Sequence, residues 1–133
     1  MKKRLLYLIL PVITLILEIL PYGAVCNFAN PEGEPWRKTF SYFDLTPFGY
    51  ANVAPLLTAI TTCVMLVFLL VYLFTGETKI ITSTKALLCV GIVLSVCPLL
   101  FGINFFSVVG ALITASLITE WVLLLFAVKA QRK

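Results

Sequence analysis

The sequence predicts an all-α integral membrane protein whose four transmembrane helices form one compact bundle, with both chain ends on the cytoplasmic side. Two observations support this fold class. Hydrophobic types make up 61 % of the 133 residues and charged types 12 %, whereas soluble domains carry roughly 45–50 % and 25 %. Four stretches are also apolar enough, and long enough, to cross about 30 Å of hydrocarbon as helices. Lipid is therefore the expected solvent for a single membrane domain, residues 1–133.

The four predicted spans each hold about 20 mostly apolar residues, the length that a helix needs to cross the hydrocarbon core. A signal peptide is an alternative for the first span, because a basic start, an apolar stretch and the small residues Gly23 and Ala24 resemble a leader cut near Cys26. The apolar stretch is longer than the roughly 7–15 residues usual in a leader. Cleavage would leave three spans. The four spans cover residues 5–25, 51–74, 81–103 and 105–128.

Clusters of basic residues predict the orientation of these spans. Cytoplasmic loops of membrane proteins carry an excess of Lys and Arg. In this chain basic residues precede the first span, lie between the second and third, and follow the fourth, while the two opposite connections carry less positive charge. The pattern indicates a multi-pass protein of the cell membrane with both termini in the cytoplasm. The clusters are Lys2, Lys3 and Arg4, then Lys79 and Lys85, then Lys129, Arg132 and Lys133.

The first extracytoplasmic loop, residues 26–50, is the only sizeable segment expected outside the membrane. Its residues Trp36, Phe40 and Phe43 fall at i, i+4 and i+7, which predicts a short helix lying in the headgroup layer with its rings at the interface. The loop is interpreted as an aromatic belt that anchors the outer face. The alternative is a docking surface for a partner or an apolar ligand.

Two acidic residues, Glu18 and Glu120, lie deep inside the first and fourth predicted spans. An ionised carboxylate is costly there, so such residues are rare and usually face the protein interior. No basic residue lies at matching depth, and we therefore expect both to be neutral, hydrogen-bonded acids. The polar neighbours expected for Glu18 are Thr14 and Tyr22 on its own helix face and Thr58, Ser95 and Thr114 from the other spans, and Glu120 shares a face with Ser116.

The cysteines and the missing histidine limit the chemistry of the chain. None of the four cysteines forms a C-x-x-C pair, and no histidine is present, so neither a metal site nor a cofactor is expected. Cys26 and Cys97 both lie towards the outer side, and a disulfide between them is an alternative that their difference in depth disfavours. Neither a general base nor a spaced set of interfacial acids is found, and we therefore expect no enzyme and no catalytic residue.

Four spans with a glutamate in the first, Glu18, resemble the outline of the small multidrug-resistance transporters. In that family a first-helix carboxylate exchanges protons for cationic drugs, so the resemblance implies a similar use of Glu18. The long aromatic loop and the clear charge bias of this chain depart from the family pattern. The chain is therefore not assigned to the family.

Two hypotheses for the function remain from the sequence. The first is a non-catalytic accessory or interaction subunit, whose loop and small-residue helix faces bind another membrane protein. The alternative is a small transporter or channel subunit that uses Glu18, which would need a homo-oligomer because four helices leave little room for a pathway. The expected partners are thus the lipid bilayer and either another membrane protein or a second copy of the chain. The net charge of +4 is too scattered to indicate nucleic acid.

Overall fold

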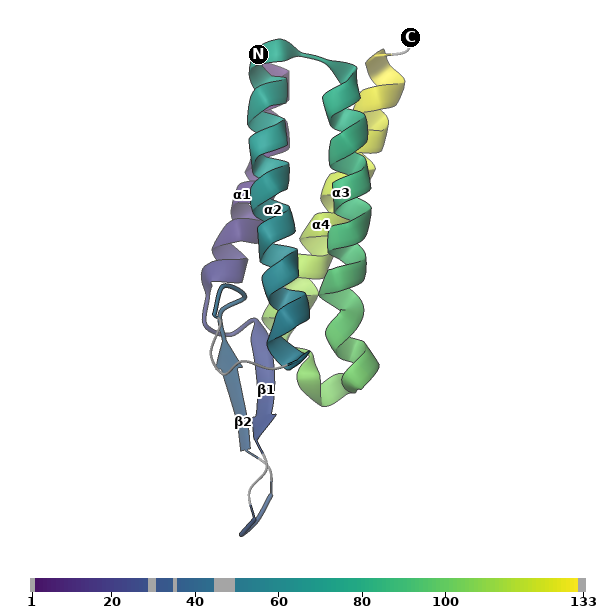
Figure 1. Ribbon diagram of the computed structural model, residues 1–133. Helices are drawn as coiled ribbons and strands as arrows, with labels where there is room; N and C mark the ends of the chain where they lie inside the picture. Colours follow the sequence, from purple (N-terminus) through teal and green to yellow (C-terminus); the bar gives the residue numbers. More distant parts are fainter. Residues whose placement is uncertain (1, 29–30, 35, 45–49, 132–133) are drawn as a thin grey trace.

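The computed structural model describes residues 2–28, 31–34, 36–44 and 50–131. Its fold is helical, with 78 % of the described residues in helices, as the sequence predicted. Among the described residues, three helical stretches are long and apolar enough to cross a membrane: Val53–Thr75, Thr78–Phe101 and Val108–Gln131. Four long helices stand side by side (Figure 1): α1 (Lys2–Ile19), α2 (Tyr50–Thr75), α3 (Thr78–Val96) and α4 (Val108–Gln131).

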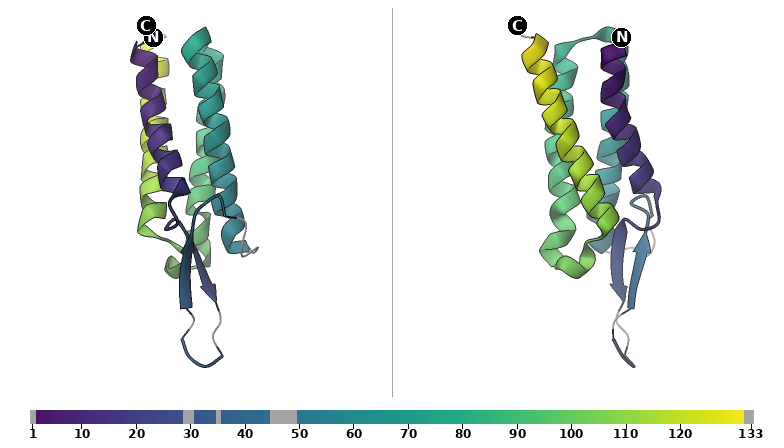
Figure 2. Two further views of the ribbon diagram at one scale, coloured as in Figure 1. Left: turned by 90° about the vertical axis from the view of Figure 1, so that its left-hand side faces the viewer. Right: turned by 180° about the vertical axis from the view of Figure 1, so that it is seen from behind.

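The helices form an up-and-down bundle in which α1 and α3 each pack against both α2 and α4. The start of α1, the connection from α2 to α3 and the end of α4 lie at one end of the bundle (Figures 1 and 2). We call this the basic end, because Lys2, Lys3, Arg4, Lys79 and Lys129 belong to it. The opposite end is the hairpin end.

The bundle is apolar on its outer surface and mixed inside. Leucine, isoleucine, valine and phenylalanine cover the outside, while threonine, serine and glutamate side chains are buried between the helices together with an apolar core that includes Met65, Leu88 and Leu117. A soluble bundle has a polar outer surface, whereas membrane helices face lipid and associate through small and polar residues as well as apolar ones. The buried polar residues of the helices are Thr14, Glu18, Thr58, Thr62, Thr84, Ser95, Ser116 and Glu120.

A β-hairpin takes the place of the interfacial helix, so the prediction of a helix there is wrong. Strands β1 (Ala24–Phe28) and β2 (Trp36–Phe40) pair antiparallel, with Ala24 opposite Phe40 and Phe28 opposite Trp36. The spacing of Trp36, Phe40 and Phe43 matches a helical period, but residues 36–40 are extended and pair with residues 24–28. The partner strand decides, because its backbone supplies the hydrogen bonds of an antiparallel ladder.

Helix α1 is shorter than the predicted span, which ran to residue 25. It ends at Ile19 because Pro21 has no N–H to continue the ladder and disfavours helical geometry at Leu20. The carbonyl oxygen of Glu18 instead accepts hydrogen bonds from the Tyr42 N–H and the Ser41 hydroxyl, each at 3.0 Å. With 18 residues, α1 is about 27 Å long, and its first turn holds three basic residues.

Two short 3₁₀-helices, η1 (Cys97–Phe101) and η2 (Ile103–Phe105), join α3 to α4. Pro98 lies in the first turn of η1 and cannot donate to the preceding turn, so the α-helix gives way there. Gly102 between them has a φ of 125°, a conformation that favours glycine. The predicted third span therefore consists of an α-helix followed by a tighter turn.

Candidate functional site

Glu18 lies on the last turn of α1 and is completely buried. The hydroxyl of Thr62 on α2 donates to its Oε1 at 2.8 Å. Within the part of the chain that the structure describes, Oε2 has no hydrogen-bond partner. Thr58, the expected neighbour on α2, donates instead to the carbonyl oxygen of Ala54 at 2.9 Å. The carboxyl thus meets α2 one turn closer to the basic end than we predicted.

The other predicted neighbours of Glu18 form separate pairs between helices. The hydroxyls of Thr14 on α1 and Ser116 on α4 lie 2.7 Å apart, and the Thr114 hydroxyl on α4 donates to that of Ser95 on α3 at 3.0 Å. Tyr22 does not share the face of Glu18, because it follows the end of α1 and is 59 % exposed. The predicted site is therefore a set of interhelical contacts and not one cluster.

Glu120 is the second buried carboxyl, with 1 % of its surface exposed. Neither of its oxygens has a hydrogen-bond partner among the described residues. It lies one helical turn from Ser116 towards the basic end, while Glu18 lies one turn from Thr14 towards the hairpin end. The side chains Glu18, Thr62, Thr14, Ser116 and Glu120 therefore follow one another along the inside of the bundle, and we call them the interior polar line.

The base of the hairpin is fixed to the bundle. The Ser107 hydroxyl donates to the Gly23 carbonyl oxygen at 2.6 Å and accepts the Gly110 N–H at 2.9 Å. Arg37 on β2 donates to the Phe106 carbonyl oxygen at 3.3 Å. Hydrogen bonds thus join the hairpin and its preceding turn to the segment that opens α4.

Tyr42 completes this attachment, since its side chain is buried and its ring packs against Gly23. A Cβ atom on Gly23 would lie 2.8 Å from Cδ1 and Cε1 of the ring, so only glycine fits there. Burial and, to a lesser degree, the Glu18 carboxylate raise the pKa of the Tyr42 phenol. Its hydroxyl is therefore neutral in the physiological range.

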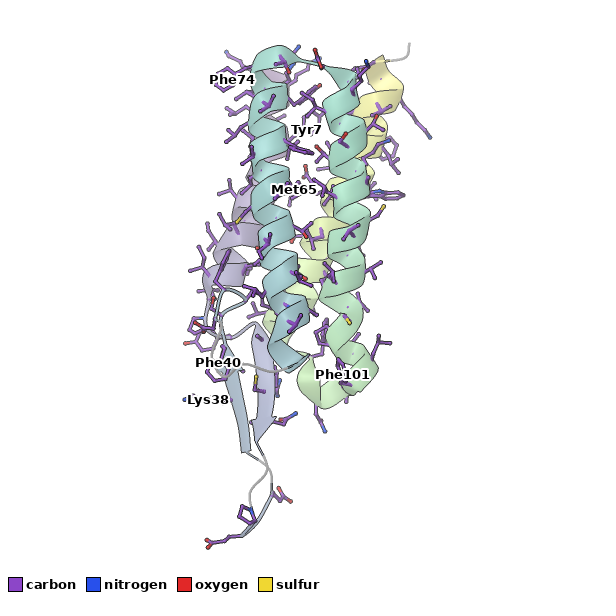
Figure 3. The ribbon with its side chains drawn as sticks, in the orientation of Figure 1. Tyr7, Lys38, Phe40, Met65, Phe74 and Phe101 are labelled. Carbon is purple, nitrogen blue, oxygen red and sulfur yellow. The ribbon has the colours of Figure 1, made fainter. Side chains whose placement is uncertain are left out.

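The far part of the hairpin extends beyond the helices (Figures 1 and 2), and residues 31–34 are exposed. On β2, Phe40 is half-buried against the core, and the Lys38 Nζ atom lies 5.5 Å from the centre of its ring (Figure 3). Phe43 is 37 % exposed. Only the backbone of Trp36 is described, as the first residue of β2. These three aromatic residues therefore lie on and after a strand.

Metal-ligating groups do not gather in the described ranges: no three His, Cys, Asp or Glu side chains come together there. The same ranges hold no disulfide between Cys26 and Cys97. Comparison with models of known protein families, with curated protein sequences and with solved structures finds no match for this chain.

Proposed function

We propose that the chain crosses the cell membrane four times, with both termini in the cytoplasm and the hairpin outside. The outward face of α1 supports α1 as the fourth span, because Leu5, Ile9, Ile13 and Ile16 are all exposed on it and only lipid would cover such a stripe. The orientation is supported by the basic end, where positive charge favours the cytoplasm.

Within this topology, we propose that the protein is a non-catalytic accessory subunit that binds another membrane protein through its hairpin. The observation that carries the proposal is a hairpin fixed at its base and exposed at its far end. A two-stranded hairpin is marginal on its own, so the bonds from Ser107 and Arg37 hold the strands in one place outside the bilayer. A projecting element that is attached at its base is suited to recognition.

Site-specific photo-crosslinking in intact cells tests the accessory function. A photoreactive amino acid replaces Glu34 near the hairpin tip in one variant and Val93 on the lipid-facing side of α3 in a matched control; both positions are exposed. The proposal expects one discrete adduct with a different protein from position 34 and none from position 93. An adduct of twice the chain's own mass, or no protein adduct from position 34, would contradict it.

A transporter or channel subunit is the second candidate, and the interior polar line favours it. Glu18 and Glu120 leave three buried carboxylate oxygens without a partner in the described residues, and hydroxyl groups lie between them. Because both carboxyls face the inside of their own bundle, a pathway would run within one chain and not between subunits. Proton flux into liposomes that is lost in Glu18→Gln, with the fold intact, would favour this candidate over the accessory subunit.

A further inference from the structure

A cavity of ≈ 340 Å³ opens at the basic end, between α1, α2 and α4. Two cationic side chains, Lys3 and Arg4, and the phenol ring of Tyr7 line it from α1; Tyr72 lines it from α2; Gln131 and two alanines line it from α4. The alanines leave room that larger residues would fill. Tyr7 lies among the helices near this end (Figure 3).

The polar walls of the cavity are held in place by contacts between the three helices. Arg4 Nη1 donates to the carbonyl oxygen of Leu73 at 3.4 Å, and its guanidinium carbon lies 5.5 Å from the centre of the Tyr72 ring. Gln131 Nε2 donates to the Tyr72 hydroxyl oxygen at 2.7 Å. A guanidinium has five N–H donors in a planar fork, and the Leu73 carbonyl accepts from one nitrogen of Arg4.

The charge in the cavity is not neutralised from within the described residues, where no carboxylate pairs with Lys3 or Arg4. An anion is therefore the complementary ligand. Guanidinium and ammonium groups together with phenol hydroxyls match the oxygens of a phosphate, which arginine binds through two parallel hydrogen bonds.

We propose that this cavity binds the phosphate of an anionic phospholipid headgroup. Its position at the end of the helices is the depth at which headgroups lie, and basic pockets between helices on the cytoplasmic side suit such lipids. The exposed side chains of Leu5 and Leu6 follow directly along α1 and offer an apolar surface to the acyl chains. The proposal rests on the proposed topology, which places the basic end at the cytoplasmic surface, and is independent of the hairpin and of the proposed accessory function.

Native mass spectrometry of the detergent-purified chain tests the proposal by titration with phosphatidylglycerol, phosphatidylcholine or inorganic phosphate. The expected result is that phosphatidylglycerol binds at least about fivefold more tightly than phosphatidylcholine. Arg4→Gln and Lys3→Gln should each lower the affinity for phosphatidylglycerol about fivefold. This corresponds to the roughly 1 kcal/mol that one basic residue contributes near a membrane surface. Arg4→Gln removes a contact with α2 and could disturb the fold. Lys3→Gln leaves that contact in place, so weaker lipid binding by the Lys3→Gln variant tests the proposal independently.

The matched control is Lys129→Gln, which removes one positive charge from an exposed position on α4 that does not line the cavity. It should change the affinity less than twofold. Equal losses in all three variants, or equal binding of the two lipids, would show a diffuse surface effect and overturn the proposal. If inorganic phosphate binds as tightly as phosphatidylglycerol and displaces it, the ligand of the cavity is a soluble anion, and the proposal of a lipid headgroup is overturned.

Discussion

The Thr62 hydroxyl on α2 donates a 2.8 Å hydrogen bond to Glu18 Oε1 on α1, inside a bundle whose outer surface is apolar. The contact joins the shortest of the four long helices to its neighbour. It also gives the buried Glu18 carboxyl a partner on a second helix. Whether this contact stabilises the bundle can be measured directly.

A double-mutant cycle with Glu18→Leu and Thr62→Val measures the coupling between the two side chains. Hydrogen bonds between membrane helices contribute about 0.6 kcal/mol on average and up to about 1.7 kcal/mol, and we expect a coupling energy in that range. The measurement is the free energy of unfolding in mixed detergent micelles. Thr61→Val is the matched control, since the Thr61 hydroxyl donates to the Leu57 carbonyl oxygen of its own helix. A coupling as large with Thr61 as with Thr62 would contradict the contact.

Replacing Gly23 by alanine should loosen the base of the hairpin. The new Cβ would lie 2.8 Å from two atoms of the buried Tyr42 ring, and such overpacking costs about 1–3 kcal/mol. Gly91→Ala is the control, because its Cβ would meet only ordinary contacts at 3.5 Å or more and alanine favours the helix. Unfolding free energies of the two variants decide: a Gly23→Ala variant as stable as Gly91→Ala would refute this packing.

Replacing Glu120 by leucine should stabilise the bundle. Both carboxylate oxygens are buried without a partner among the described residues, and removing a buried polar group of this kind gains about 1–3 kcal/mol. Glu120→Gln keeps a polar group in the same place and should gain much less. Loss of stability in Glu120→Leu, measured by the same unfolding assay, would mean that the carboxyl has a partner and would argue for a site there.

The sequence predicts the helices well but not their ends or the hairpin. The apolar runs of α2, α3 and α4 identify these helices because each run is almost entirely helical. The first apolar run does not predict the end of α1 correctly. Ala24 and Val25 extend the run, but they are buried residues of strand β1 and not part of the helix. Composition does not distinguish a membrane helix from a buried strand.

The candidate site could be predicted in part. The burial of Glu18 and Glu120 follows from the cost of a carboxyl that faces lipid. Their neighbours do not follow, because the sequence does not show how far α1 and α2 are offset along the bundle axis. In the structure this offset places Glu18 opposite Thr62 instead of Thr58. Such pairings depend on how helices align, which no single span encodes.

If α1 crosses the membrane, as proposed, the termini and the hairpin lie on opposite sides. Thiol labelling of intact cells with a membrane-impermeant reagent tests it, using Lys2→Cys, Glu34→Cys and Lys129→Cys in a background whose four native cysteines are replaced by alanine. The account predicts that only position 34 is labelled before permeabilisation and all three afterwards. Labelling of positions 2 and 34 together, with position 129 protected, would contradict it, because three spans would then remain.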